Sequence, residues 1–245
     1  MQNVPFEKID LSLDETHHIY EGMSIYPQRY KHVMSYHTPG YAPVETDTEA
    51  FFINTKGEKV FSRSFEKAFG FYEGLAAVMD TKGWFHINDS GKNLYSHRFA
   101  WVGNFQETRC AVRDHDNNYF HINTHGDRIY KQDYCYVGDY KYGIAVVITE
   151  SGYSTHIDQS GELLHGEYFE ELDVYHKGLA IAKDKCGYFH IDKHGKPIYH
   201  KRYVKLEPFY NGLALATTKD GEKTTINERG ETICRITATI PKRLN

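Results

Sequence analysis

Short runs of apolar residues alternate with polar residues along this chain, and the same pattern returns many times. In the clearest copy, residues 74–107, an apolar Gly-Leu-Ala-Ala-Val run at 74–78 is followed by a polar stretch. Residues 84–88 place alternate side chains on opposite faces, as in a half-buried β-strand. Asn88 to Gly91 then has the residues of a type I turn closed by a glycine at positive φ. No stretch has the period of a helix, so the pattern predicts an all-β chain of antiparallel hairpins.

The pattern has a period of 34 or 35 residues, marked by the residue before an Ile or its equivalent in each copy. This column consists of His18, Phe52, His86, His121, His156, His190 and Thr225. A period of this size is typical of propellers, solenoids and other repeat arrays. It predicts a single repeat domain over residues 1–245. Its approximate units are 1–39, 40–73, 74–107, 108–142, 143–177, 178–211 and 212–245.

The predicted architecture is a β-propeller-like ring of about seven short repeats. The first copy lacks a Gly-x-Ala strand ahead of His18, and the last copy loses its register after Ile233. Offset ends of this kind suit a ring in which the two termini complete a shared blade and leave no strand edge exposed. A ring of six blades and an open array of β-hairpins are the alternatives, because blades in familiar propellers usually take about 40 residues or more.

Three further columns recur in the units. Turn glycines lie three residues after an Asn or Asp, at Gly57, Gly91, Gly126, Gly161, Gly195 and Gly230. One aromatic column consists of Tyr30, Phe65, Phe99, Tyr134, Phe169 and Tyr203. A second consists of His37, Phe71, Phe105, Tyr140, Tyr175 and Phe209. Aromatic rings favour strands, and whether these columns are buried decides whether they can serve as stacking surfaces for a ligand.

One unit shows a family pattern with particular clarity. Residues 178–212 contain Gly178-Leu179-Ala180, Gly187-Tyr188, Ile191-Asp192 and Gly195 before a return to Gly-Leu-Ala. This order resembles the bacterial WG-repeat (KWG) family, well over residues 40–236 and weakly over 16–39. The chain is similar to a divergent branch, since Lys82 and Cys186 replace the Trp before the Gly and a His precedes the Ile. The resemblance implies interaction through repeats rather than a defined reaction.

Composition limits the partners and the cellular location that we expect for the protein. A net charge of -4 with interspersed signs argues against a nucleic-acid partner. The four cysteines, Cys110, Cys135, Cys186 and Cys234, form no CxxC pair and are expected to be reduced thiols. Neither a signal peptide nor an apolar run long enough to span a bilayer is present. We therefore expect a soluble cytoplasmic protein, with export without a cleaved signal, for example as a bacterial effector, as the alternative.

Repeated histidines and arginines are the candidate ligand-binding residues. They are His86, His121, His156, His190, Arg29, Arg98 and Arg202. Imidazoles are common metal ligands, but equivalent strands of a ring hold them too far apart for a tetrahedral site. We expect each His to hydrogen-bond a backbone group or the Asn/Asp turn of its own or the next blade. The arginines could receive carboxylates or phosphates, and pairing with an Asp of the neighbouring blade is the plainer interpretation. We predict no metal and no cofactor.

Catalytic motifs are missing from the sequence. No nucleophile elbow, phosphate-binding glycine loop or HExxH motif appears, and units of nearly equal length leave no insertion for an active site. We predict a non-catalytic interaction module that recognises another protein through loops on one face of the scaffold. A carbohydrate or small-ligand receptor that uses the repeated aromatic, Arg and His positions is the alternative, and a hydrolase is a third hypothesis. A sugar-binding surface should repeat between blades, whereas a protein-binding surface should differ.

Whether the ring is closed can be tested with a truncated protein. If the termini complete a shared blade, deletion of residues 1–39 removes the partner of the last unit and exposes its strand edge. We expect the truncated protein to aggregate or to lose its cooperative unfolding transition. In an open array the deletion removes roughly one interface between neighbours. A truncated protein that stays soluble and melts cooperatively in a thermal scan would favour the open array.

Overall fold

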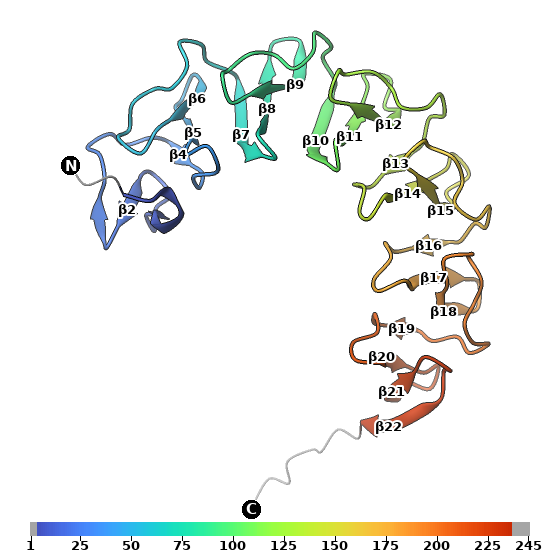
Figure 1. The fold of residues 1–245 in the computed structure, drawn as a ribbon. Coiled ribbons are helices and arrows are strands. Elements are labelled where there is room, and N and C mark those ends of the chain that lie inside the picture. The colour runs from blue at the N-terminus through green and yellow to red at the C-terminus, as the bar shows by residue number, and fades with distance from the viewer. Residues whose placement is uncertain (1–3, 237–245) are drawn as a thin grey trace, which may run out of the picture. The chain divides into compact units, whose positions relative to one another are not determined.

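The computed structural model describes residues 4–236 and forms two compact parts, residues 4–132 and 133–236, each of which is described by itself. Both parts consist of small antiparallel sheets, and the described residues contain seven of them (Figure 1). A single 3-10 turn, η1 (Phe6–Lys8), precedes the first sheet. None of the described residues forms a helix long and apolar enough to cross a membrane. The all-β class predicted from the repeat is confirmed.

The first part contains four three-stranded sheets. The first sheet is β1 (Asp10–Leu11), β2 (His18–Tyr20) and β3 (Met23–Ser24), and the second is β4 (His32–Val33), β5 (Ala42–Glu45) and β6 (Ala50–Ile53). The third sheet is β7 (Lys67–Tyr72), β8 (Leu75–Asp80) and β9 (Gly83–Asn88). The fourth is β10 (Trp101–Gln106), β11 (Arg109–Arg113) and β12 (Tyr119–Asn123).

The second part contains three sheets. They are β13 (Tyr136–Val137), β14 (Ile144–Ile148) and β15 (Ser154–Asp158), then β16 (Glu171–Leu172), β17 (Ala180–Asp184) and β18 (Gly187–Ile191). The last sheet is β19 (Lys205–Leu206), β20 (Leu213–Thr217), β21 (Lys223–Asn227) and β22 (Thr232–Ile236). Among the described residues, this sheet alone has a regular fourth strand. In the third sheet, for example, the fourth position is held by single bridges such as Trp84 to Phe99.

The sheets are offset from the repeat units of the sequence. Strand β10 lies at the end of the unit 74–107, yet it pairs with β11 of the next unit, joining Trp101 to Arg113 and Val102 to Val112. A β-bulge between Val102 and Phe105 then shifts the register. The offset joins successive units through backbone hydrogen bonds, because the first strand of each sheet belongs to the unit before it.

The predicted turn has the expected geometry. Gly91 has a φ of 73°, and its N–H donates to the carbonyl of Asn88 at 2.9 Å. The side-chain oxygen of Asn88 accepts hydrogen bonds from the backbone N–H groups of Ser90 and Lys92. A Cβ on Gly91 would lie only 2.6 Å from the ring of Phe61 in the preceding sheet. The same close approach joins Tyr95 to Gly126 and Tyr199 to Gly230. Glycine is therefore required both for its backbone conformation and for contact between neighbouring sheets.

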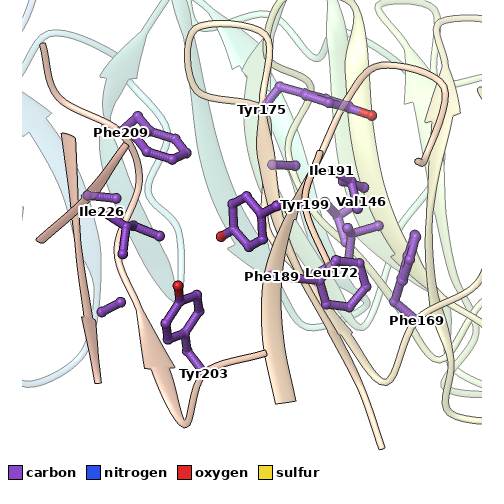
Figure 2. Packing of buried hydrophobic residues seen from close by; sticks show 14 residues of the cluster. Val146, Phe169, Leu172, Tyr175, Phe189, Ile191, Tyr199, Tyr203, Phe209 and Ile226 are labelled. Atoms are coloured by element: carbon purple, nitrogen blue, oxygen red, sulfur yellow. The ribbon is translucent and has the colours of Figure 1, made fainter. Parts of the chain in front are cut away.

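Aromatic side chains fill the space between the sheets. The first aromatic column is buried from Phe65 onward, and its first member Tyr30 is half-buried. Figure 2 shows the buried cluster of the second part, where Phe169, Phe189 and Tyr203 pack with Leu172 and Ile226. In the second column the expected first member, His37, is wrong: Tyr36 is 7% exposed and fills that place, while His37 is exposed. The first unit is one residue shorter after its His, which moves the aromatic forward by one.

Candidate functional site

Four histidines of the column, His18, His86, His156 and His190, join their own sheet to the next one. His86 is 1% exposed, and its Nδ1 accepts a hydrogen bond from the Tyr95 hydroxyl at 2.6 Å within its own sheet. Its Nε2 donates to the carbonyl of Gly103 at 2.9 Å, on the first strand of the following sheet. Since a neutral imidazole carries one donor and one acceptor nitrogen, these two contacts fix the tautomer with hydrogen on Nε2. We call this arrangement the histidine clasp.

Similar contacts recur in the other units that have a column histidine. His190 contacts Tyr199 at 2.6 Å and the Glu207 carbonyl at 3.0 Å. His18 contacts the Tyr26 hydroxyl and donates to the Met34 carbonyl at 2.9 Å. His121 is fully buried and contacts Tyr130 at 2.6 Å. The expectation that these histidines hydrogen-bond a backbone group is confirmed for His18, His86, His156 and His190, and the group belongs to the next sheet.

One copy uses a second histidine in place of tyrosine. His156 Nδ1 lies 3.0 Å from His165 Nε2, and His156 Nε2 lies 3.0 Å from the carbonyl of Asp173. The N–H of Glu167 donates to Nδ1 of His165 at 3.1 Å, so His165 carries its hydrogen on Nε2 and donates it to His156. The same donor and acceptor pattern is thus maintained by a different side chain.

The clasp histidines His18, His86, His156 and His190 also pack against an aromatic ring of the next sheet. The ring centroids of His86 and Phe105 are 4.8 Å apart, and those of His190 and Phe209 are 4.2 Å apart. In the first sheet, His18 packs on Tyr36 at 4.4 Å. Residues of the second aromatic column therefore cover the imidazoles and exclude water from them.

The two units without a column histidine also lack the clasp partner. Where Phe52 replaces the histidine, Phe61 replaces the tyrosine, and their rings lie 5.7 Å apart. Where Thr225 replaces it, Cys234 stands directly opposite in the strand register. The hydrogen-bonded pair is exchanged as a unit, because either polar member alone would leave a buried group without a partner. The partner tyrosines were missed from the sequence, although their spacing of eight or nine residues after the histidine was visible there.

Burial holds the clasp histidines in their neutral form. Loss of solvent lowers the pKa of His86, His156 and His190 to about 4, and it also lowers the pKa of His18. The backbone carbonyls that they contact oppose this shift without cancelling it. No group of three or more His, Cys, Asp or Glu side chains within residues 4–236 is arranged to hold a metal ion.

The predicted arginines have partners within their own sheets. Arg98 donates from Nε to Asp80 at 2.9 Å and stacks 3.5 Å from the centre of the Phe85 ring. Hydrogen bonding to Arg98 lowers the pKa of Asp80. Arg202 repeats this arrangement with Asp184 and Phe189. The expectation of an Asp from the neighbouring blade is therefore wrong for both residues, because the Asp ends the second strand of the same sheet and faces the arginine there.

Arg29 has a different role, since it pairs with no Asp and binds backbone instead. Its Nη1 donates to the carbonyls of Tyr26, Pro27 and Gln28 at distances between 2.9 and 3.3 Å. These contacts cap the short loop after β3. The structure therefore places the four predicted histidines in the interior and the three predicted arginines on loops, and it does not bring the two sets together around one cavity.

A hollow opens between the first strands of the third and fourth sheets. It has a volume of about 350 Å³ and is lined by Phe69, Tyr72, Trp101 and Asn104, with His37 and apolar backbone at its base. Phe69 is 46% exposed and stacks on Trp84 at 5.3 Å with their planes 14° apart. Of the two tryptophans in the chain, Trp101 lines this hollow and Trp84 stacks on Phe69. We call it the aromatic groove.

A second hollow lies at the equivalent place in the other part, between the sheets that begin with β16 and β19. Its volume is about 650 Å³, and its lining includes Glu171, Asp173, Lys205, Glu207 and Lys223. Burial raises the pKa of Asp173. In strand register Asp173 corresponds to Phe69, and Lys205 to Trp101. The same position of the repeat therefore forms an aromatic groove in one part and a charged groove in the other.

Comparison with known proteins agrees with this architecture. Residues 51–84 and 188–221 match the model of the WG containing repeat. These two matches support assignment of the chain to the WG-repeat family, as the Gly-aromatic and Ile-Asp spacing predicted. No curated protein matched the sequence.

Solved structures with a similar fold are β-propeller proteins. The crystal structure of the eukaryotic initiation factor has a TM-score of 0.51 and 11% identity, covering 85% of this chain and 65% of that one. BamB from Moraxella catarrhalis has a TM-score of 0.48 and 12% identity, covering 89% of this chain and 79% of that one. At these identities the likeness is one of fold alone. The propeller-like class is confirmed, and closure into a ring stays a prediction.

The joint replacement of histidine and tyrosine by Phe52 and Phe61 predicts that the two members of a clasp contribute to the free energy of unfolding in a non-additive way. His190→Phe leaves the Tyr199 hydroxyl and the Glu207 carbonyl without their partner, and we expect it to reduce the free energy of unfolding by about 1–3 kcal/mol. Adding Tyr199→Phe should cost less than the sum of the single changes, by at least about 0.5 kcal/mol. Urea denaturation of the four proteins measures this coupling.

The matched control for this cycle is His194→Phe, which changes an exposed turn histidine and should alter stability by less than about 0.5 kcal/mol. Strictly additive costs at positions 190 and 199 would contradict the clasp. Stoichiometric metal in the untagged protein that His121→Ala removes would contradict a purely structural role for the column.

The lowered histidine pKa values predict loss of stability in mild acid. The unfolded chain binds protons near pH 6.5, whereas the folded clasps resist protonation until about pH 4, so stability present above pH 6.5 declines between these values. Each such histidine contributes about 2 kcal/mol of the loss at pH 5. We expect the urea midpoint to fall over this range, and the His190→Phe/Tyr199→Phe protein to show a shallower fall. A midpoint that is constant from pH 7 to 5 would refute the assignment.

Proposed function

We propose that this chain is a non-catalytic interaction module whose partner is another protein. One observation carries the proposal: the first strand of each sheet from the second to the last has an exposed or half-buried position at the same register, and its residue type varies, with lysine alone occurring twice. These positions are His32, Lys67, Trp101, Tyr136, Glu171 and Lys205. The next residue along each strand is a covered apolar one, namely Val33, Ala68, Val102, Val137, Leu172 and Leu206.

This contrast favours a protein partner over a repetitive ligand. A receptor for a sugar polymer is expected to present the same aromatic and polar set on each sheet, whereas this row contains imidazole, ammonium, indole, phenol and carboxylate groups. Variable chemistry on a constant scaffold suits the irregular surface of one folded partner. The repeated aromatic columns are packed between sheets, so they offer no stacking surface for sugars.

The two grooves place this variation in concave surfaces, where a partner's side chains can be desolvated. We therefore propose the first-strand rims as the recognition surface, ahead of the hairpin loops that the sequence favoured. The hydrolase hypothesis has less support, since the carboxylates of the charged groove lie beside lysines and Glu171 is hydrogen-bonded to Lys183 and Tyr188. We also propose that the module acts in the cytoplasm.

Site-specific photocrosslinking tests this function. A benzoylphenylalanine introduced at Trp101 or Lys205 should give discrete protein adducts when the chain is expressed in its own organism and irradiated. The matched control is the same probe at Asp116, an exposed residue of a hairpin turn. Adducts at the rim positions that are absent at Asp116 support the proposal, and adducts at Asp116 alone would restore the loops as the recognition surface. Absence of protein adducts at all three positions would overturn the proposal.

A further inference from the structure

The aromatic groove has two flat apolar walls. Phe69 forms one wall and is held by stacking nearly parallel on Trp84, and Trp101, 39% exposed, stands at the opposite rim. Gly70 lies at the base, where His37 approaches so closely that a Cβ would meet its ring at 2.5 Å. The walls are therefore lined by ring faces, and the base is held open by the absence of a side chain.

The polar side chains that line this groove are those of His37, Tyr72, Trp101 and Asn104. Among residues 4–236, the indole N–H of Trp101 and the hydroxyl of Tyr72 have no hydrogen-bond partner. An indole nitrogen donates and cannot accept. No carboxylate lines the groove, in contrast to the equivalent groove of the other part, where Asp173 and Glu207 occupy the matching positions. A complementary ligand should offer apolar bulk together with hydrogen-bond acceptors.

We propose that the aromatic groove binds an extended, proline-containing segment of the partner protein, an inference that rests on the proposed function. Proline has a carbonyl acceptor and no N–H donor, and its ring packs flat on aromatic faces. A polyproline II segment is solvated along its whole backbone and is already extended, so it loses little entropy on binding. Its carbonyls match the indole donor of Trp101, and its pyrrolidine rings match the two walls.

A carbohydrate fits this groove less well. Sugar rings also stack on tryptophan, but each ring carries several hydroxyl groups that require partners when they are desolvated. The lining supplies polar groups from Asn104, His37, Tyr72 and Trp101, while Phe69 and the small residues of the base supply none. Hydroxyl groups buried against these apolar residues would each cost about 1–3 kcal/mol. The chemistry of the lining therefore favours the peptide.

Charge adds a preference for acidic residues beside the prolines. Arg113 stands directly opposite Trp101 in the strand register, so the two side chains share one face of the sheet. Its Nε is buried without a hydrogen-bond partner among the described residues, and its guanidinium lies 5.8 Å from the centre of the Tyr119 ring. A carboxylate in the partner would be attracted by the positive charge of this guanidinium beside Trp101.

Tryptophan fluorescence and peptide binding test the inference directly. An oligoproline peptide and a peptide library with two fixed prolines, flanked by Glu or by Lys, serve as probes. We expect the emission of Trp101, which lines the groove, to shift on binding, and Glu-flanked peptides to bind more tightly than Lys-flanked ones. Trp101→Ala and Phe69→Ala should each weaken binding at least about tenfold, measured by anisotropy of labelled peptide. The matched control, Tyr153→Ala, changes an exposed aromatic of the other part and should leave affinity within about twofold.

Three results would overturn the inference. They are failure of every proline-containing probe to bind, binding that Trp101→Ala and Phe69→Ala leave unchanged in proteins with normal thermal melts, or fluorescence shifts produced by cello- or chito-oligosaccharides but not by peptides. Failure here is distinguishable from failure of the proposed function. If photocrosslinks at Trp101 persist while no proline peptide binds, a protein still contacts the rim and only the proline chemistry is wrong.

Discussion

The fold depends on one repeated contact, the buried imidazole that connects a sheet to its successor. A small sheet of three short strands cannot bury both faces alone, so its stability comes from its neighbours. His86 provides that link in both directions, since Tyr95 belongs to its own sheet and the Gly103 carbonyl to the next. Because the imidazole is neutral and both nitrogens have partners, it adds direction to an interface that apolar packing alone would leave free to slide.

The constancy of this joint explains where the chain can vary. The histidine and its tyrosine partner, the turn glycine against the tyrosine ring, and the aromatic residue of the next sheet all lie in the interior. The first strand of the next sheet is held by the hydrogen bond from the histidine to one of its backbone carbonyls. The exposed side chains of that strand take no part in the contact, so tryptophan at position 101 and lysine at 205 fit the same backbone. Two equivalent grooves can thus differ completely in chemistry at little cost to stability.

Much of this architecture could be predicted from the sequence, because a strict period reports on repeated local geometry. Turn glycines and small strand residues reflect constraints within a few residues, and the structure agrees with them. Partners across sheets were harder to predict. The offset pairing of β10 with β11, the pairing of Arg98 with its own sheet and the place of Tyr36 all depend on which strand edges meet, which periodicity alone does not specify. The grooves could not be predicted from the sequence either, because the residues that line them differ from repeat to repeat.

The Phe52 and Phe61 pair shows that an apolar joint is compatible with this fold, so the histidines are not required merely to fill space. An apolar pair removes the hydrogen bonds but also removes the penalty for a misplaced partner. A histidine and a tyrosine are stabilising in one register only, because any other leaves buried donors and acceptors unpaired. In a chain of seven similar sheets, pairing of the wrong repeats is the main competing structure. Polar joints with strict geometry at four of the column positions oppose that competition.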